Sequence, residues 1–158
     1  MIIGIFVQTT YDHAGIFARH IADALRERDH DVEIRLLRKR SNPNPWDFNV
    51  NLVRPPESEE YDCIIIGGPA VVGSSRVVQA YLKEEVSWKG KIAAAFAVAW
   101  KPLAFLNSTA LERMSDMLEV LNAKVVEGES IRCVWRTDQH EVKQAAQRLS
   151  ARIVEAGK

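Results

Sequence analysis

The sequence predicts an α/β domain in which five parallel strands form a sheet that is covered by helices on both faces. Short, continuously apolar runs alternate along the chain with segments whose apolar residues recur at helical spacing. Runs that are apolar throughout are typical of strands buried on both faces of a parallel sheet. Parallel strands joined through helices require right-handed crossovers. A length of 158 residues fits one domain over residues 1–158.

The first half of the chain predicts two strands and one helix. Residues 2–7 are an unbroken apolar run, and residues 14–28 carry apolar side chains at helical spacing. Residues 31–37 alternate apolar and polar side chains, which indicates a half-exposed edge strand. The tract 38–60 holds four prolines among polar residues, so it is predicted to be a long loop, which usually signals function or disorder.

The middle of the chain predicts two further buried strands. Residues 63–66 form one of them, which ends at the breaker residues 67–69, and residues 91–98 form the next. Ser74 or Ser75 can cap the helix between them.

The last third predicts two helices around a fifth strand. Thr109 stands at capping-box spacing from Glu112, and a helix is expected to start there. Residues 123–126 and 131–135 form the last strand, with a kink at Gly128. The capping-box spacing recurs at 138–141, before the final amphipathic helix.

Composition excludes several functional classes. With 47% hydrophobic and 27% charged residues, the chain is neither disordered nor membrane-spanning. The 21 basic and 21 acidic side chains leave no net field to attract nucleic acid or a membrane. The first residues lack the features of a signal peptide, so the cytoplasm is expected. Cys63 and Cys133 lie in apolar runs and are expected to be buried and unpaired.

Three segments are expected to meet where ligands bind in such sheets, outside the carboxyl ends of the strands. They are residues 8–14, 67–75 and 97–102. The first places the hydroxyls of Thr9 and Thr10 before a helix N-terminus, where a phosphate can be bound. The segment matches neither the Walker loop nor the Rossmann fingerprint. It could also be a helix cap and turn that binds nothing.

Residues 61–69, Tyr-Asp-Cys-Ile-Ile-Ile-Gly-Gly-Pro, resemble the third strand of the flavodoxin-like flavoproteins. The family's phosphate loop falls on residues 9–14, where Asp12 stands in place of glycine. A variant of that loop in quinone reductases is similar at Tyr11 and His13. The resemblance spans nearly the whole chain, and it implies a flavodoxin-like three-layer sandwich with a five-stranded parallel sheet of order 2-1-3-4-5.

The resemblance implies FMN as cofactor. The residues expected at its phosphate are Thr9, Thr10, Tyr11, Asp12, His13 and Ala14, and those expected at its ring are Pro69, Ala70, Val71, Val72, Gly73, Ala97, Val98, Ala99, Trp100 and Lys101. Trp100 can stack on the ring or can anchor a protein interface, and the two readings are weighted equally. The apolar residues that follow it support the interface. No metal is expected, since the spacing of Asp12, His13 and His20 does not place them on one helical face.

The function expected from the resemblance is that of a small flavin-dependent reductase or electron-transfer protein. Electron-carrying flavodoxins are strongly acidic, so a neutral chain favours a quinone or another small acceptor, with a homodimer completing the pocket. The alternative is a flavin-free module that binds a protein through Val71, Val72, Trp100 and Phe105. The basic run at residues 35–40 is interpreted as a solvated face.

Overall fold

The computed structural model describes residues 1–9, 12–40, 49–70, 75–103, 105–133 and 138–158, with the side chain of Lys101 left out. Five parallel strands form one sheet of order β2-β1-β3-β4-β5. The elements, in chain order, are β1 (Ile2–Val7), α1 (His13–Arg26), β2 (Asp31–Leu36), β3 (Cys63–Pro69), α2 (Arg76–Glu84), β4 (Ile92–Trp100), the 3₁₀ turn Lys101–Leu103, α3 (Leu106–Val120), β5 (Lys124–Cys133) and α4 (Gln139–Ala156).

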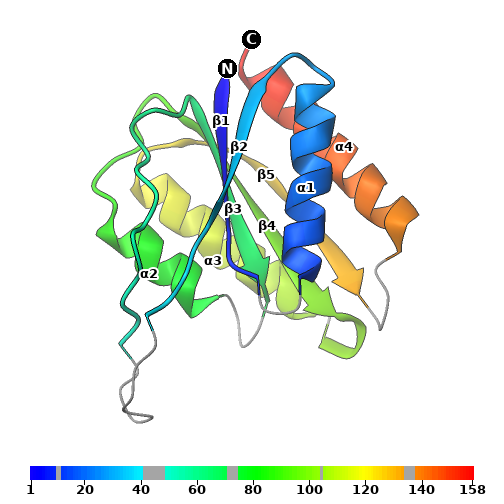
Figure 1. Ribbon diagram of the computed structural model, residues 1–158, viewed down its shortest axis with the longest axis horizontal. Helices are drawn as coiled ribbons and strands as arrows, with labels where there is room; N and C mark the ends of the chain where they lie inside the picture. Colours follow the sequence, from blue (N-terminus) through cyan, green and yellow to red (C-terminus); the bar gives the residue numbers. More distant parts are fainter. Residues whose placement is uncertain (10–11, 41–48, 71–74, 104, 134–137) are drawn as a thin grey trace.

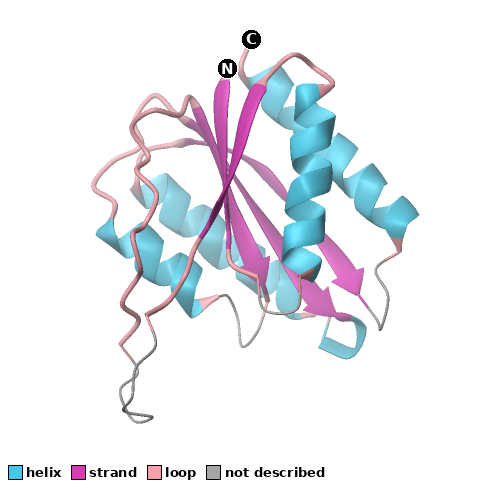
Figure 2. Cartoon of the chain, in the orientation of Figure 1, coloured by secondary structure: helices cyan, strands magenta, loops and turns pink. Residues whose placement is uncertain are grey.

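Helices cover both faces of the sheet (Figures 1 and 2). The pair α1 and α4 packs on one face, where Ile3, Ile5 and Phe17 belong to the same buried cluster. The pair α2 and α3 covers the other face, with Phe6 and Ile64 in a second cluster. The predicted three-layer architecture and strand order are confirmed. No helix in the described part of the chain has the length and apolar character needed to cross a membrane.

The strand β3 extends beyond its predicted end. Gly67, Gly68 and Pro69 continue the pairing with β4 as far as Val98. A side chain at Gly67 would overlap the carbonyl oxygen of Phe96, so glycine allows the two backbones to lie this close. Residues that usually break a strand are here part of its ladder.

The predicted start of α3 at Thr109 is wrong, because the helix already begins at Leu106. The Asn107 side chain donates a hydrogen bond of 3.0 Å to the carbonyl oxygen of Ile131 in β5. This tertiary contact fastens the first turn of the helix to the sheet and outweighs the local capping signal. The cap predictions for α2 and α4 are confirmed at Ser75 and Asp138, whose side chains accept from backbone N–H groups.

The two predicted pieces of the last strand form one strand, and the predicted kink at Gly128 is present. The register with β4 shifts between Ala94 and Phe96, opposite that glycine. A side chain at Gly128 would overlap the Ala95 carbonyl oxygen. Trp135, in the second predicted piece, lies outside the described residues.

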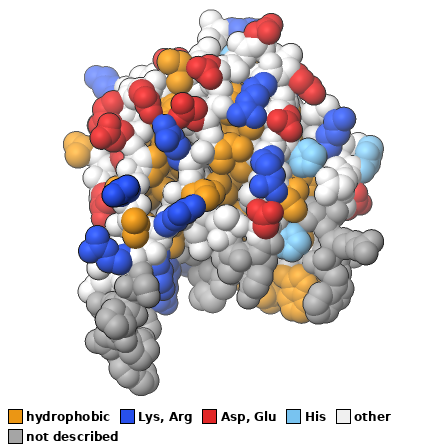
Figure 3. All heavy atoms as spheres, in the orientation of Figure 1, with side chains coloured by type: hydrophobic (Ala, Val, Ile, Leu, Met, Phe, Trp, Pro, Cys, Tyr) orange, Lys and Arg blue, Asp and Glu red, His pale blue; other side chains and the backbone are white. Residues whose placement is uncertain are grey.

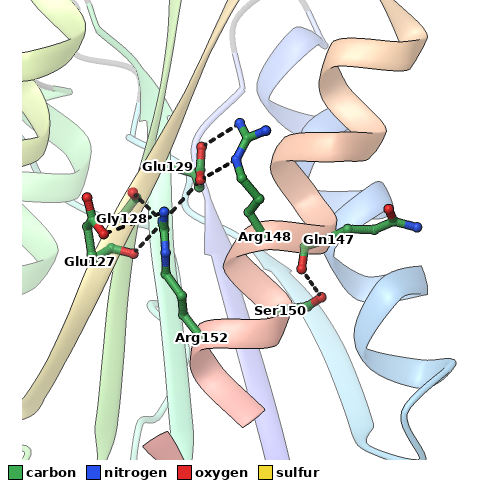
Figure 4. A network of polar contacts seen from close by, with 7 residues as sticks. All are labelled: Glu127, Gly128, Glu129, Gln147, Arg148, Ser150 and Arg152. Atoms are coloured by element: carbon green, nitrogen blue, oxygen red, sulfur yellow. Dashed lines mark hydrogen bonds and ion pairs between the residues drawn. The ribbon is translucent and has the colours of Figure 1, made fainter. Parts of the chain in front are cut away.

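A buried carboxylate at this bulge joins β5 to α4 (Figure 4). Glu129 is 8% exposed and accepts two hydrogen bonds from Arg148, at 2.9 and 3.1 Å. Arg152 lies 3.0 Å from the same carboxylate and donates to the carbonyl oxygens of Glu127 and Gly128, each at 3.3 Å. The two arginines therefore satisfy both the buried charge and the backbone of the bulge.

Replacing Arg152 with methionine keeps an apolar stem but removes the donor to the bulge and one partner of Glu129. We expect Arg152→Met to lower the free energy of unfolding by about 1–3 kcal/mol, because a buried acceptor loses its donor. Urea denaturation measures the change, with Arg113→Met on the exposed side of α3 as control. Equal stability of the two variants would contradict a structural role for Arg152.

The turn between α1 and β2 holds a histidine whose two ring nitrogens are buried. The ring nitrogens of His30 are shielded from solvent and find no hydrogen-bond partner among the described residues. Burial, followed by the charge of the N-terminus, lowers the pKa of His30 below its ordinary value of 6.5. Below that pH the unfolded chain binds more protons than the folded one, so stability falls as the pH decreases.

We therefore expect His30→Phe to flatten the loss of stability as the pH falls below about 6.5. Denaturant midpoints measured at several pH values test this, with His140→Gln as a control at an exposed histidine. An unchanged slope in His30→Phe would show that another group causes the acid sensitivity.

Candidate functional site

The carboxyl ends of β1, β3 and β4 lie side by side at one edge of the sheet (Figure 1). Val7 pairs with Gly67, and Pro69 pairs with Val98. The chain leaves β1 toward β2 on one side, and β3 lies on the other, so the sheet order reverses at this point. The structure thus brings together the described parts of the three segments that the sequence nominated.

Polar contacts connect the first two of these segments. The backbone N–H of Gln8 donates to the carbonyl oxygen of Gly67 at 3.0 Å. The hydroxyl of Ser75 donates to the side chain of Gln8, while its oxygen accepts from the amide of Val78 and caps α2. The end of β1 is therefore fixed relative to the N-terminus of α2. No sequence signal indicated this contact, because the two residues are 67 positions apart.

Asp12 enters α1 in a left-handed conformation, with φ of 61°. Its backbone amide donates to the hydroxyl oxygen of Thr9 at 3.0 Å, which links the N-cap of the helix to the end of the first described segment. A left-handed backbone favours glycine and costs other residues about 1 kcal/mol or more. The aspartate therefore adopts the backbone geometry that a glycine at this position would adopt freely.

The Asp12 carboxylate does not cap α1. It accepts a hydrogen bond from Arg19 at 3.0 Å, seven residues further along the helix. A side chain at Gly15 would overlap the Asp12 carboxylate, so the glycine provides the space for it over the first turn. The side chains of Asp12 and Arg19 are 63% and 56% exposed. The ion pair turns the carboxylate along the side of the helix and balances its charge.

This arrangement is compatible with an anion at the start of α1. The first turn contains no acidic residue, and no side chain caps it among the described residues. Backbone N–H groups at a helix N-terminus and the helix dipole favour negative charge. The hydroxyl of Thr9, which uses its oxygen as an acceptor, keeps its proton for donation to a ligand.

The predicted ring-binding residues of the third segment mostly belong to a strand. Ala97, Val98 and Ala99 lie in β4, and their side chains are buried in the two core clusters. Trp100, the last residue of β4, is 49% exposed. Contact with a ligand at this point therefore depends on Trp100 and on backbone groups.

An apolar lip, formed by Trp100, Leu103 and Phe105, follows the end of β4. Leu103 is 41% exposed and Phe105 is 68% exposed. Across the edge, Pro69 is half-buried, and the Ala70 amide donates to the Val98 carbonyl oxygen at 2.8 Å, which holds β3 and β4 together beyond their last pair. His13 and Ala14 form the start of α1, where Ala14 is buried.

The remaining predicted site residues cannot be placed. Thr10, Tyr11, Val71, Val72 and Gly73 lie outside the described residues, as does the side chain of Lys101.

Neither cysteine thiol is activated as a nucleophile. Burial raises the pKa of the Cys63 thiol to about 12 and also raises that of Cys133. Both are free and buried, as predicted, with β4 between their strands. Within the described residues, no three His, Cys, Asp or Glu side chains lie close enough together to hold a metal ion.

Arg19 is the residue at this edge that the sequence interpretation missed. Its spacing of two helical turns from Asp12 places both on one face, so helical periodicity alone could have identified the ion pair.

The three-dimensional structure resembles known proteins far more than the sequence does. No protein-family model matches the chain, and no curated protein matches its sequence significantly. Flavodoxin 2 from Bacillus cereus superposes with a TM-score of 0.74 over 99% of both chains at 19% identity. Flavodoxin 1 from the same organism gives 0.72 over 98% of both chains at 18% identity. A Fusobacterium nucleatum flavodoxin bound to flavin mononucleotide gives 0.70 over 98% of both chains at 15% identity.

The chain has the flavodoxin-like fold. The likeness extends over essentially the full length of both chains, so no large insertion separates this flavodoxin-like chain from those structures. The edge at which its sheet order reverses is the one described above, formed by the ends of β1, β3 and β4.

Proposed function

We propose that the protein binds FMN and works as a redox protein. The observation that carries the proposal is the Asp12–Arg19 ion pair, which holds a carboxylate away from the open N-terminus of α1. The flavodoxin-like fold and its likeness to a structure bound to flavin mononucleotide support the same ligand. Without the ion pair, an aspartate beside a phosphate dianion would be repulsive.

The residues at the edge divide into two groups by their chemistry. The Thr9 hydroxyl and the N–H groups that begin α1 would hold the phosphate. Trp100 would contact the ring, with Pro69 and the backbone at Ala70 on the neighbouring strand. When bound, FMN supplies the electron-transfer chemistry, and the protein contributes binding, orientation and exclusion of water.

A small flavin-dependent reductase is the more specific form of this proposal. The formal charge of zero gives the chain no net negative field to attract a basic protein partner. A quinone or a similar small acceptor suits an edge that is bordered by the apolar lip. A second copy of the chain would cover the lip and complete the pocket.

A flavin-free interaction module is the second candidate. The exposure of Trp100 and Phe105 favours it, because exposed aromatic side chains at one edge are typical of protein interfaces. In this case the lip would bind a protein partner directly.

Absorption spectroscopy separates the two candidates. We expect the purified protein, mixed with FMN and dialysed, to retain the visible band of a bound flavin. Riboflavin, which lacks the phosphate, should bind more weakly. The absence of a retained band would refute the proposal and favour the interaction module.

The ion pair provides a sharper test of the phosphate site. We expect Arg19→Ala to weaken FMN binding by up to about fivefold, because the unpaired carboxylate then repels the phosphate. Asp12→Gly should strengthen binding, since it removes the charge and relieves the left-handed backbone. Fluorescence titration measures both effects.

The double variant serves as the control. In the Asp12→Gly background, Arg19→Ala should have no effect on FMN affinity, and riboflavin affinity should respond to neither change. An equal effect of Arg19→Ala in both backgrounds would show that the ion pair does not govern the site.

A further inference from the structure

A groove lies along the outer edge of the sheet, beside the carboxyl half of β2 and the residues that follow it. It has a volume of about 860 Å³ and runs between β2 and the segment 53–60. Its lining residues are Ile34, Arg35, Leu36, Arg38, Arg40, Val53, Arg54, Pro55, Pro56, Glu57, Glu60 and Tyr61. Four arginines against two glutamates give it a formal charge of +2 in a chain whose total is zero.

The groove forms where the segment after β2 and the returning segment 51–54 stop pairing and separate. Beyond β2, the carbonyl oxygen of Arg38 accepts from Val53 at 2.9 Å, and the amide of Arg40 donates to Asn51 at 2.7 Å. Arg54 then takes a left-handed conformation, with φ of 46°, at the point where the returning segment leaves this pairing. In Figure 1 the segment that follows β2 and the returning segment run together at the lower left and diverge above that point.

The divergence leaves part of the β2 backbone without a neighbouring strand. The amides of Asp31 and Leu37 donate to β1, and the direction alternates along a strand, so the N–H and C=O groups of Ile34 and Leu36 point away from the sheet. No hydrogen bond between described residues reaches them. The outward carbonyl of Val32, nearer the start of the strand, accepts from Arg26 at 2.7 Å.

Of the four arginines that line the groove, one has charged or polar partners and three form no ion pair with a described residue. Arg35 pairs with Glu33 at 2.7 Å and donates to the Tyr61 hydroxyl. No ion pair within the described residues involves Arg38, Arg40 or Arg54, and all three are exposed. Figure 3 shows basic side chains gathered beside apolar ones on the lower left of this face, with acidic side chains above them.

We propose that this groove binds an extended acidic segment of another protein, which adds to the edge of β2 as a further strand. The open N–H and C=O groups of Ile34 and Leu36 would pair with its backbone, as in other cases of strand addition. Carboxylates of the segment would face the unpaired arginines. Leu36, 42% exposed, and Val53, 38% exposed, would contact its apolar side chains. A phosphate or a nucleic acid would satisfy the arginines but not the backbone edge.

A labelled peptide of alternating glutamate and valine tests the proposal by fluorescence anisotropy on the flavin-free, full-length protein. We expect this peptide to bind. A control peptide with lysine in place of every glutamate should not bind. Arg38→Glu combined with Arg54→Glu should weaken binding at least about tenfold, because two charged contacts are lost. Arg113→Glu, an exposed charge reversal on α3, should leave the affinity unchanged.

Two N-methylated peptides test the strand pairing itself. In one, every glutamate nitrogen is methylated, and in the other, every valine nitrogen. Since alternate N–H groups face opposite sides of a strand, one isomer should bind like the parent and the other should lose binding. Equal binding of both, loss in both, or equally tight binding of a DNA oligonucleotide of the same charge overturns the proposal. None of these readouts depends on FMN.

Discussion

Burial of the sheet on both faces is the constraint on which the rest of the structure depends. A strand buried on both faces, such as β1 with Ile3, Ile5 and Phe6, leaves backbone N–H and C=O groups unpaired only at its ends. An outer strand also leaves them unpaired along its free side. Within the sheet, unpaired backbone groups therefore lie at the strand ends and along the free sides of the outer strands β2 and β5. At β5, Arg152 covers the bulge carbonyls, whereas the segment 51–53 bonds to Arg38 and Arg40, which lie beyond the end of β2.

The carboxyl edge shows how a departure from a local rule is compensated nearby. Asp12 occupies a left-handed position and carries a charge that opposes an anion. Arg19 balances that charge, and Gly15 provides the room for the carboxylate to turn toward it. The three residues lie on one helical face, so a single helix contains both the departure and its compensation.

Hydrophobic periodicity predicted the layers because burial on two faces is visible in a one-dimensional pattern, whereas the strand order was implied by the resemblance to flavodoxin-like flavoproteins. What periodicity could not predict depends on contacts between distant residues. Asn107 fastens α3 to Ile131 and moves its start, and the glycine at position 67 extends β3 against Phe96. At the site, the loops that would meet FMN could be located from the strand ends, but the Gln8–Ser75 contact could not. The groove at β2 depends on where the segment after residue 53 leaves its neighbour, and the sequence showed there only a basic run.

The chain has no net charge, but its apolar lip and its β2 groove differ in the side chains that they present. The apolar lip presents Trp100, Leu103 and Phe105 to solvent, while the β2 groove concentrates arginines against an open strand edge. A partner bound at the groove would be acidic, the opposite of the basic proteins on which acidic flavodoxins dock. Since β2 adjoins β1, such a partner would lie next to the strand whose end begins the proposed FMN site. The proposed groove would thus select a partner by charge and backbone pairing, through contacts that the proposed FMN site does not use.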